Sequence, residues 1–508
     1  MYSQITSIAL HGIEGIKINC EIDMANGLPS FDIVGLPDTS VKEAKERVKS
    51  AVKNCSFDFP LKHITVNLAP ADIKKEGSVY DLPIFLGILL CSEQLVSEKD
   101  IKDTAFIGEL SLKGDIRKVK GVLPMICCAK DNGIKNIVIP YDNYAEASFI
   151  DNINIIPVKH VNEVIGYLKN TYEITFPEIK ENGSEETLSE ILDFSDICGQ
   201  EDAKRAMEIA AAGGHNILLI GSPGSGKSML SKRLITILPD MTYKESLECT
   251  KIYSVAGLLP SGGIIKTRPF RNPHHTISSS ALTGGGRNPM PGEISLAHNG
   301  VLFLDELPEF NKSALEALRQ PIEDKKVTIS RVFGTVSYPS SFMLVCAMNP
   351  CKCGYFGHPS KDCTCSETSI QNYKSKISGP LLDRIDIHIE VPPVTFEQMQ
   401  KKIKPESSSK IRQRVNNARK RQQLRYKNTG ISCNANLTPA MIKEFCICDD
   451  VAKSMLKDAF EGLSLSARAY DKILRLAKTI ADLEEKDIIS SQHIAEAINY
   501  RSLDRKYF

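Results

Sequence analysis

The chain has 508 residues, of which 42% are hydrophobic and 25% are charged, so it is long enough for about three globular domains. Its 63 basic and 62 acidic residues give a formal net charge of +1 at neutral pH. This balance excludes a polycation that binds nucleic acid over its whole surface, and any such surface is expected to be local.

No apolar run approaches the roughly 20 residues of a membrane span, and the first residues do not have the pattern of a signal peptide. The sequence also contains fifteen cysteines, which in such a chain favour reduced thiols. We therefore expect a cytoplasmic protein without a membrane partner.

Residues 1–170 are expected to form a first α/β domain. Residues 63–70 have the pattern of a strand and residues 82–90 that of a buried helix. Ser40 and Glu43 have the spacing of a capping box, which predicts the start of another helix there.

The order of segments in this domain resembles the C-terminal protease domain of Lon, which has a ribosomal S5-like fold. The resemblance rests on KKEGSVYDLPIFLGIL, FIGELSLKGDIRKVKGVLP and NGIKNIVIP. Ile84 and Leu123 occupy the places of the nucleophilic serine and the general-base lysine, and neither side chain can act as a nucleophile or a base. Ser78 and Lys120 lie nearby at the wrong spacing. We expect a retained fold without peptidase activity, used for assembly or binding.

Residues 171–193 are expected to be an acidic linker. From Tyr172 to Asp193 there are seven acids and one lysine, with a proline and an Asn-Gly pair. This composition is typical of a solvated tether.

The stretch NILLIGSPGSGKSML, residues 216–230, contains a phosphate loop. An apolar strand runs directly into G-x-x-x-x-G-K-S, and a helical pattern follows. Backbone N–H groups of such a loop converge on phosphate oxygens, while the lysine reaches the β- and γ-phosphates and the serine hydroxyl binds Mg²⁺. The expected ATP-binding residues are Gly221, Ser222, Pro223, Gly224, Ser225, Gly226, Lys227 and Ser228.

Residues 194–395 are predicted to form the nucleotide-binding core, and their first segment resembles the entry segment of AAA+ ATPases. This resemblance implies that Ile197 lies near the adenine ring. The apolar run VLFLDE ends in Asp305, expected to bind Mg²⁺ with Ser228, and in Glu306, expected to polarise the attacking water.

Three further residues match AAA+ positions. Asn349 ends a buried strand, where sensor 1 orients the water near the γ-phosphate. Arg384 stands where an arginine reaches the γ-phosphate of the neighbouring subunit. Arg468 begins a helix at the sensor 2 position, with action within or between subunits left open.

Two segments of the core could contact DNA. Residues 268–292 contain three arginines, two histidines and no acid, and Arg268, Arg271 and Arg287 are candidate DNA contacts. A structural insertion packed against its own subunit is the alternative. Residues 324–341 predict a hairpin like the presensor insertion of magnesium chelatases and MCM helicases, with Arg331 as a backbone contact or a solvated charge.

Four cysteines form two close pairs on one polar loop: Cys351, Cys353, Cys363 and Cys365. Two such pairs joined by a short loop can close a tetrahedral Zn²⁺ site. His358 is an alternate ligand. The alternative to a metal site is four reduced thiols that bind no metal.

Residues 396–508 are expected to form a basic helix and a helical lid. Residues 401–427 contain eleven basic residues and one acid. Nucleic-acid binding is one interpretation, and a solvated lid helix or one that faces an acidic neighbour is the other.

Taken together, these motifs resemble the YifB/ComM family of magnesium-chelatase-like AAA+ ATPases over essentially the whole chain. The resemblance rests on GSPGSGKS, NPHHTISSSALTGGG, VLFLDELPEF, AMNPCKCGYFGHPSKDCTC, SGPLLDRIDIHIEVP and LSARAYDKILRLAKTIADLE. It implies an α/β fold with an AAA+ core and an α-helical lid, and an ATP-dependent homo-hexameric ring. For competence-associated members it implies a DNA helicase that drives branch migration during recombination, with recombination proteins as partners.

Two alternative functions remain open at this stage. A metal-chelatase motor would need partner subunits that stimulate its ATPase. A Lon-like protease would need a nucleophile, and Ile84 and Leu123 argue against it.

Overall fold

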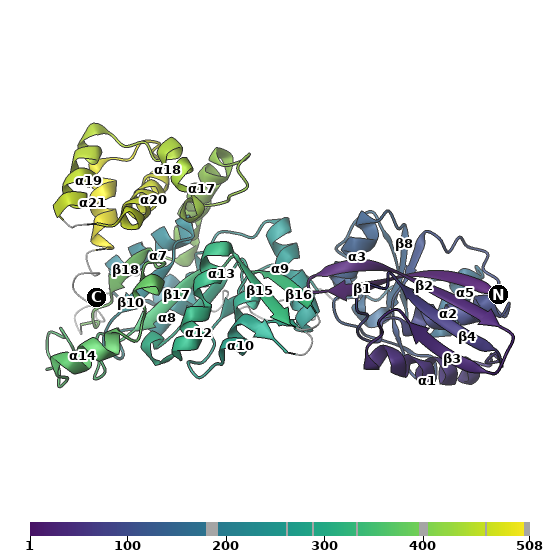
Figure 1. The fold of residues 1–508 in the computed structure, drawn as a ribbon. Coiled ribbons are helices and arrows are strands. Elements are labelled where there is room, and N and C mark those ends of the chain that lie inside the picture. Colours follow the sequence, from purple (N-terminus) through teal and green to yellow (C-terminus); the bar gives the residue numbers. More distant parts are fainter. Residues whose placement is uncertain are drawn as a thin grey trace.

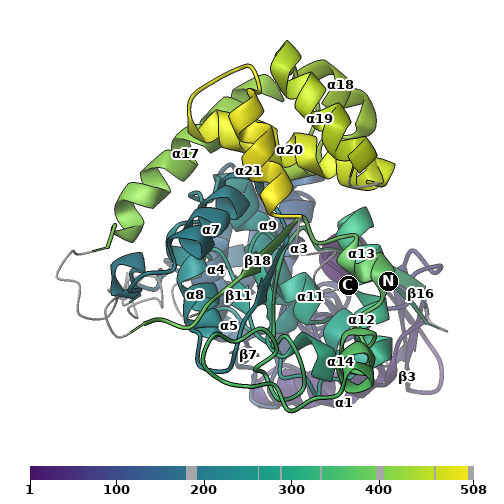
Figure 2. The ribbon, with the colours of Figure 1, turned by 90° about the vertical axis from the view of Figure 1, so that its left-hand side faces the viewer.

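The computed structural model describes residues 1–178, 192–260, 263–286, 289–331, 334–395, 405–462 and 465–501. Three bodies follow one another along the chain: an α/β domain at the N-terminal end, a central α/β core, and a helical lid over one end of the core (Figures 1 and 2). This confirms the predicted fold class, a P-loop core with a helical lid preceded by a separate α/β domain.

The N-terminal domain is built on a seven-stranded sheet in the order β3-β4-β2-β1-β5-β8-β9. Pairs β1–β2 and β2–β4 are antiparallel, and the remaining neighbours are parallel. The strands are β1 (Tyr2–His11), β2 (Glu14–Ala25), β3 (Ser30–Val34), β4 (His63–Ala69), β5 (Thr104–Phe106), β8 (Asn136–Pro140) and β9 (Asn154–Val158), and β6 (Glu109–Leu110) pairs with β7 (Ile116–Arg117). The helices are α1 (Thr39–Asn54), α2 (Asp81–Cys91), α3 (Val122–Asp131), α4 (Tyr144–Ala147) and α5 (Val161–Leu168).

The helix at Ile84 is buried on nearly every side, because α2 packs against the sheet and against α1. Ile84 and Leu123 are 0% and 1% exposed core residues, in keeping with their non-catalytic chemistry. The capping box predicted at Ser40 is wrong: α1 begins at Thr39, and Asp38 is its N-cap, with Oδ1 accepting a hydrogen bond from Val41 N at 2.8 Å.

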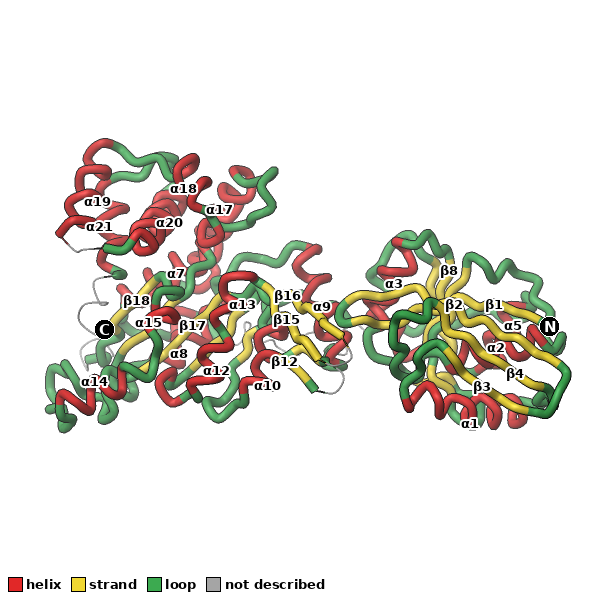
Figure 3. Tube along the Cα trace, in the orientation of Figure 1, coloured by secondary structure: helices red, strands yellow, loops and turns green. Residues whose placement is uncertain are grey.

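The core contains a parallel five-stranded sheet in the order β11-β14-β17-β10-β18. Its central strands β10, β14 and β17 are apolar and fully buried, as expected for parallel strands covered on both faces. Helices lie around the strands of the core (Figure 3). The strands are β11 (Phe270–Arg271), β14 (Val301–Leu304), β17 (Met343–Met348), β10 (Ile217–Ile220) and β18 (Ile387–Glu390). The longer helices are α7 (Glu201–Gly213), α8 (Lys227–Arg233), α9 (Tyr243–Ala256), α12 (Lys312–Ala317), α13 (Arg319–Asp324) and α14 (Glu367–Lys374), with short α10 (Ser279–Thr283), α11 (Glu293–Leu296) and α15 (Gly379–Leu382).

Two hairpins pack against the core, and the longer one contributes Val327, Ile329, Val336 and Tyr338 to its hydrophobic cluster. The predicted hairpin is present as β15 (Lys326–Arg331) and β16 (Gly334–Pro339), paired antiparallel. A shorter one, β12 (Gly284–Gly285) with β13 (Met290–Pro291), belongs to the basic segment. Both precede β17 in the chain.

The lid consists of helices α17 (Ser408–Arg425), α18 (Pro439–Phe445), α19 (Asp450–Gly462), α20 (Ala467–Leu483) and α21 (Ser491–Asn499). Helix α17 carries much of the basic segment and packs against α7 and α20. Its arginines pair with acids of the core and lid: Arg414 with Glu208 at 2.5 Å and Arg425 with Asp482 at 2.6 Å. This favours the interpretation of a lid helix that faces acidic neighbours.

The N-terminal domain packs on α9 through α3 (Figure 1). Gly121 N donates to Ser254 O at 3.1 Å, and Ser254 Oγ donates to the buried carboxylate of Glu146 at 2.6 Å. The turn between β1 and β2 reaches the hairpin, where a Cβ built on Gly12 would lie 2.4 Å from Val336. Among the described helices, none combines the length and the apolar character needed to cross a bilayer.

Candidate nucleotide and metal-binding sites

The phosphate loop joins the C-terminal end of β10 to the first turn of α8. Its glycines are required by close approach and by backbone conformation: a Cβ on Gly221 would lie 2.4 Å from Val391 O, and Gly226 has a φ of +90°. The first turn of α8 follows these glycines directly, and the N–H groups at a helix N-terminus favour a bound anion.

Lys227 folds back over the loop. Its Nζ donates hydrogen bonds to Gly221 O at 2.7 Å, to Ser222 O at 2.9 Å and to Asn349 Oδ1 at 3.2 Å. Burial lowers the pKa of the Lys227 ammonium, and the negative charges of Asp305 and Glu306 oppose that shift. The arrangement holds a cation beside the predicted sensor amide.

Ser228 and Asp305 form the second part of the site. Ser228 Oγ donates to Asp305 Oδ2 at 2.6 Å, which brings a hydroxyl and a carboxylate from α8 and from the end of β14 together. Oxygen donors of this kind suit Mg²⁺. The same groups border a cavity of about 390 Å³. It is lined by Pro223, Gly224, Gly226, Lys227, Ser228, Met229, Asp305, Glu306, Met348 and Asn349.

Glu306 also lines this cavity. Its backbone is left-handed, with a φ of +54°, and its side chain is 57% exposed. His275 Nδ1 lies 3.5 Å from Glu306 Oε2. Sequence reasoning gave His275 no role, although its place shortly after β11 in the same parallel sheet could have indicated one.

Ile197 and Gln200 belong to the entry segment, and only Gln200 contacts the phosphate loop. Ile197 is fully buried in the apolar core and does not line the 390 Å³ cavity, so its adenine contact stays a prediction. Gln200, which sequence reasoning gave no role, donates from Nε2 to Ser225 O and, at 3.4 Å, to Pro392 O. Gln200 thereby ties the loop to the segment that follows β18.

Arg384 and Arg468 lie together, away from the phosphate loop. Both line a cavity of about 910 Å³ between the core and the lid, along with Lys472 and Arg475. Arg384 Nη2 is 2.5 Å from Glu323 Oε1. Within the described residues, the side chain of Arg468 is exposed and makes no hydrogen bond or ion pair. Neither arginine lines the 390 Å³ cavity of its own chain.

The predicted DNA contacts of the basic segment are used differently. Arg268 is mostly buried and donates to Asn299 O at 2.7 Å and to Glu245 at 3.2 Å. Arg271 makes a bidentate pair with Glu293 at 2.6 and 2.7 Å. These contacts favour the alternative of an insertion packed against its own subunit. Arg287 lies outside the described residues, and the same holds for the side chain of Arg331 at the end of β15.

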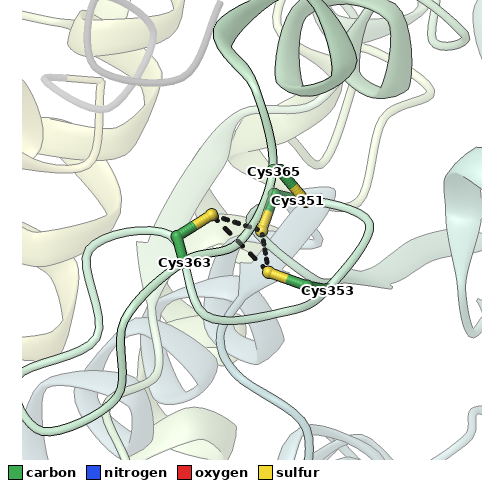
Figure 4. Close-up of side chains that lie close together, drawn as sticks. All are labelled: Cys351, Cys353, Cys363 and Cys365. Carbon is green, nitrogen blue, oxygen red and sulfur yellow. Dashed lines mark hydrogen bonds between the residues drawn. The ribbon is translucent and has the colours of Figure 1, made fainter.

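The four cysteines converge on one point (Figure 4). Their ligand atoms all lie within 4.8 Å of one another, and Cys351 Sγ is 3.3 Å from Cys353 Sγ and 3.6 Å from Cys363 Sγ. Thiolates bound tetrahedrally to zinc at about 2.3 Å stand about 3.8 Å apart, whereas a disulfide needs about 2.05 Å. The donor set therefore fits a zinc site with four cysteine ligands.

The four thiols affect one another's ionisation. Burial acts to raise the pKa of Cys353, but hydrogen bonds with the backbone of Tyr355 and Thr364 and with the Cys351 and Cys363 side chains outweigh it and lower that pKa. Backbone hydrogen bonds act to lower the pKa values of Cys363 and Cys365, but contacts with the Cys351 and Cys353 side chains outweigh them and raise both pKa values. The alternate ligand His358 is engaged elsewhere, because its Nδ1 accepts hydrogen bonds from Ser360 N at 3.2 Å and Lys361 N at 3.1 Å.

A parallel sheet with a phosphate loop, an Asp-Glu strand end, an asparagine at the end of the neighbouring strand and a helical lid defines an AAA+ P-loop protein. Three family models match the chain: "Magnesium chelatase, subunit ChlI" over residues 193–399, "Subunit ChlI of Mg-chelatase" over 20–143, and "Magnesium chelatase, subunit ChlI C-terminal" over 405–501.

Similar proteins match along nearly the whole chain. An uncharacterized protein YifB of Escherichia coli is 42% identical over 497 residues, covering 97% of this chain and 96% of the relative. The competence protein ComM of Haemophilus influenzae is 41% identical over 505 residues, covering 99% and 97%. A shorter match is to Lon protease 2 of Bacillus subtilis, at 25% identity over 147 residues, or 28% of this chain and 27% of that protein. The chain belongs to the YifB/ComM family of magnesium-chelatase-like AAA+ ATPases.

Proposed function

We propose that the chain hydrolyses ATP at the phosphate loop. The observation that carries this proposal is that Lys227, Ser228, Asp305, Glu306 and Asn349 line one cavity at the carboxyl ends of three parallel strands. Loops at the carboxyl ends of parallel strands are where α/β proteins place their ligands.

Each residue has a role that follows from its chemistry. The backbone of Gly221 to Gly226 and the Lys227 ammonium bind the phosphates. Ser228 and Asp305 would hold Mg²⁺, which neutralises charge on the β- and γ-phosphates when bound. Glu306 polarises the attacking water, and Asn349 orients it near the γ-phosphate. The hydrogen bond from Lys227 Nζ to Asn349 Oδ1 holds the Asn349 amide beside the lysine that binds the phosphates.

We place completion of the active site at the contact between two copies of the chain, within a homo-hexameric ring. Arg384 and Arg468 share a cavity that the chain's own phosphate loop does not border. This supports a role for both arginines in the active site of a neighbouring copy. An arginine supplied in this way stabilises transition-state charge and is worth roughly 10³-fold or more. Arg468 would then act in trans as well.

The substrate we propose for the motor is branched or single-stranded DNA, with branch migration during recombination or natural transformation as the outcome. The support is the full-length similarity to a protein named for competence and the β15–β16 hairpin beside the core sheet. Recombination proteins are the expected partners. The proposal does not rest on Arg268 or Arg271, since both are paired within the chain.

A branch-migration assay tests this function. Purified chain with ATP, Mg²⁺ and a three-stranded DNA junction should displace the labelled strand, and DNA should stimulate ATP hydrolysis. Lys227→Ala is the control that removes nucleotide chemistry. DNA-independent hydrolysis together with no strand displacement above the Lys227→Ala background contradicts the DNA motor.

A second candidate is the motor subunit of a metal-chelatase-like remodelling complex, which the family descriptions favour. Partner subunits, rather than DNA, would then stimulate hydrolysis. Measuring the ATPase rate with each added separately distinguishes the two.

The third cofactor we propose, besides ATP and Mg²⁺, is Zn²⁺ on Cys351, Cys353, Cys363 and Cys365. Metal analysis tests it: about one zinc per chain is expected, falling in a Cys351→Ser/Cys363→Ser variant. Well under one zinc in both proteins removes the assignment.

A further inference from the structure

The cysteine loop, residues 351–365, forms one wall of the phosphate loop. Gly354, between the first cysteine pair and the rest of this loop, faces Pro223: a Cβ built on Gly354 would lie 2.4 Å from Pro223 Cδ and 2.6 Å from Pro223 Cγ. Gly354 also has a φ of +86°. The two loops therefore touch backbone to ring with no room for a side chain.

The cysteine loop also fixes the predicted sensor residue from both of its ends. Cys351, fully buried, follows Asn349 by two residues, and Cys351 Sγ accepts a hydrogen bond from Phe356 N at 3.3 Å. On the other side, α14 begins at Glu367, two residues after Cys365, and the hydroxyl of its Tyr373 lies close to the backbone of Asn349. Asn349 thus lies between the start of the cysteine loop and the helix that follows its end.

Contacts among the thiols alone hold the cysteine loop only weakly. The sulfur contacts of Cys351, Cys353 and Cys363 range from 3.3 to 3.6 Å, and S–H groups are weak hydrogen-bond donors. A zinc ion bound by four thiolates supplies far more, because structural zinc sites contribute folding free energy directly. The ion would fix the loop that bears Gly354 and would anchor Cys351.

We propose that a zinc ion on the four cysteines positions the phosphate loop and Asn349 for hydrolysis, so that metal occupancy sets kcat while nucleotide binding persists. This rests on the proposed ATPase function. Binding persists because the phosphates are held by backbone N–H groups and Lys227, which the cysteine loop does not supply. Hydrolysis depends on the placement of Asn349, and misplacement by about 1 Å can cost about 10²-fold in rate.

Metal removal is the first test. The full-length chain is stripped of zinc with a chelator, and zinc content, binding of a fluorescent ATP analogue and ATPase rate are measured on the same sample. We expect kcat to fall by roughly 10- to 100-fold, affinity for the analogue to change less than about threefold, and stoichiometric zinc to restore the rate. An unchanged ATPase rate in zinc-free protein overturns the proposal.

A pair of matched glycine variants tests the contact without touching a ligand. Gly354→Ala places a methyl group against Pro223, whereas Gly357→Ala, at a similar φ of +74° in the same loop, meets nothing within 4 Å. Both variants should retain zinc and bind the ATP analogue. We expect a loss of about 10-fold or more in kcat for Gly354→Ala and a change of less than about twofold for Gly357→Ala.

A second substitution tests whether the loss in Gly354→Ala comes from the contact with Pro223 or from a general disturbance of the fold. Pro223→Ala removes the Cδ and Cγ atoms that the new methyl group would meet. The double variant Gly354→Ala/Pro223→Ala should therefore hydrolyse ATP faster than Gly354→Ala and close to Pro223→Ala alone. Wild-type rates in zinc-loaded Gly354→Ala, or equal losses in both glycine variants, overturn the proposal. Failure of the ATPase function itself is distinguishable, because the unmodified zinc-loaded chain would then not hydrolyse ATP.

Discussion

Ser228 Oγ and Asp305 Oδ2 are joined by a hydrogen bond of 2.6 Å that links the first turn of α8 to the end of β14. The two oxygens come from residues 77 positions apart in the chain. They are brought together because β17 pairs in parallel with β14 on one side and with β10 on the other. Ser228 and Asp305 line the same cavity as Lys227.

Asp305→Asn should raise the Mg²⁺ concentration needed for half-maximal hydrolysis by about 10- to 100-fold. The amide keeps the shape of the carboxylate and loses the negative charge that Mg²⁺ prefers. An ATPase titration with Mg²⁺ measures this, with binding of the ATP analogue as the control for folding. An unchanged Mg²⁺ requirement would show that Asp305 does not serve the metal.

Arg384→Ala should lower kcat by about 10³-fold while nucleotide binding is retained. The reason is that an arginine supplied by a neighbouring copy stabilises charge in the transition state. The Arg384 guanidinium lies outside the cavity bordered by its own phosphate loop, which fits this role. Mixing Arg384→Ala chains with Lys227→Ala chains provides the sharper measurement. Some contacts in a mixed ring join an intact phosphate loop to an intact arginine, so activity should reappear. No recovery in rings that do mix would place Arg384 in its own chain's site.

The parts of this molecule that depend on short stretches of sequence could be predicted. The apolar runs of β10, β14 and β17 predict buried strands from a few consecutive residues. The loop glycines likewise predict a turn that needs left-handed backbone. The grouping of Cys351 to Cys365 follows from close spacing in the same way.

Ion pairing over long sequence separations could not be predicted. Arg271 pairs with Glu293, and Arg414 of α17 pairs with Glu208, 206 residues away. From sequence alone such arginines look available to phosphates, since the acid that neutralises each one is brought near only by folding. Helix starts have a similar weakness: both Asp38 and Ser40 are good N-caps, and only the path of the chain selects Asp38.

His275→Ala should raise the basal ATPase rate by up to about fivefold. The contact of 3.5 Å draws the Glu306 carboxylate toward the basic segment, and a partly exposed pair of this kind contributes up to about 1 kcal/mol. Rates without DNA measure the effect. Ser280→Ala is the control in the same segment, because the exposed Oγ atom of Ser280 contacts Ser278 Oγ at 3.1 Å and not Glu306. Equal rates in both variants would mean that His275 does not restrain Glu306.

Asp386→Asn should destabilise the joint between core and lid by about 3 kcal/mol or more at pH 7. Burial acts to raise the pKa of Asp386, but the Lys472 ammonium, 3.4 Å away on α20, and contacts with His215 and Asn216 outweigh it and hold the pKa well below its usual range. The amide would leave Lys472 buried without its carboxylate. Thermal unfolding followed by circular dichroism should show a midpoint lower by about 6 °C or more.

The same carboxylate makes the stability of this joint depend on pH in a defined direction. Because its folded-state pKa is depressed, Asp386 stabilises the protein above the unfolded-state pKa of about 3.9, and that stabilisation is lost as the pH falls below this value. The wild-type chain should therefore lose more stability than Asp386→Asn between pH 5 and pH 3. Asp450→Asn is the matched control in the lid, since its pair with Lys453 is 98% and 64% exposed and should contribute less than about 1 kcal/mol. Equal acid sensitivity of the wild type and Asp386→Asn would show that Asp386 has the same pKa in the folded and the unfolded chain.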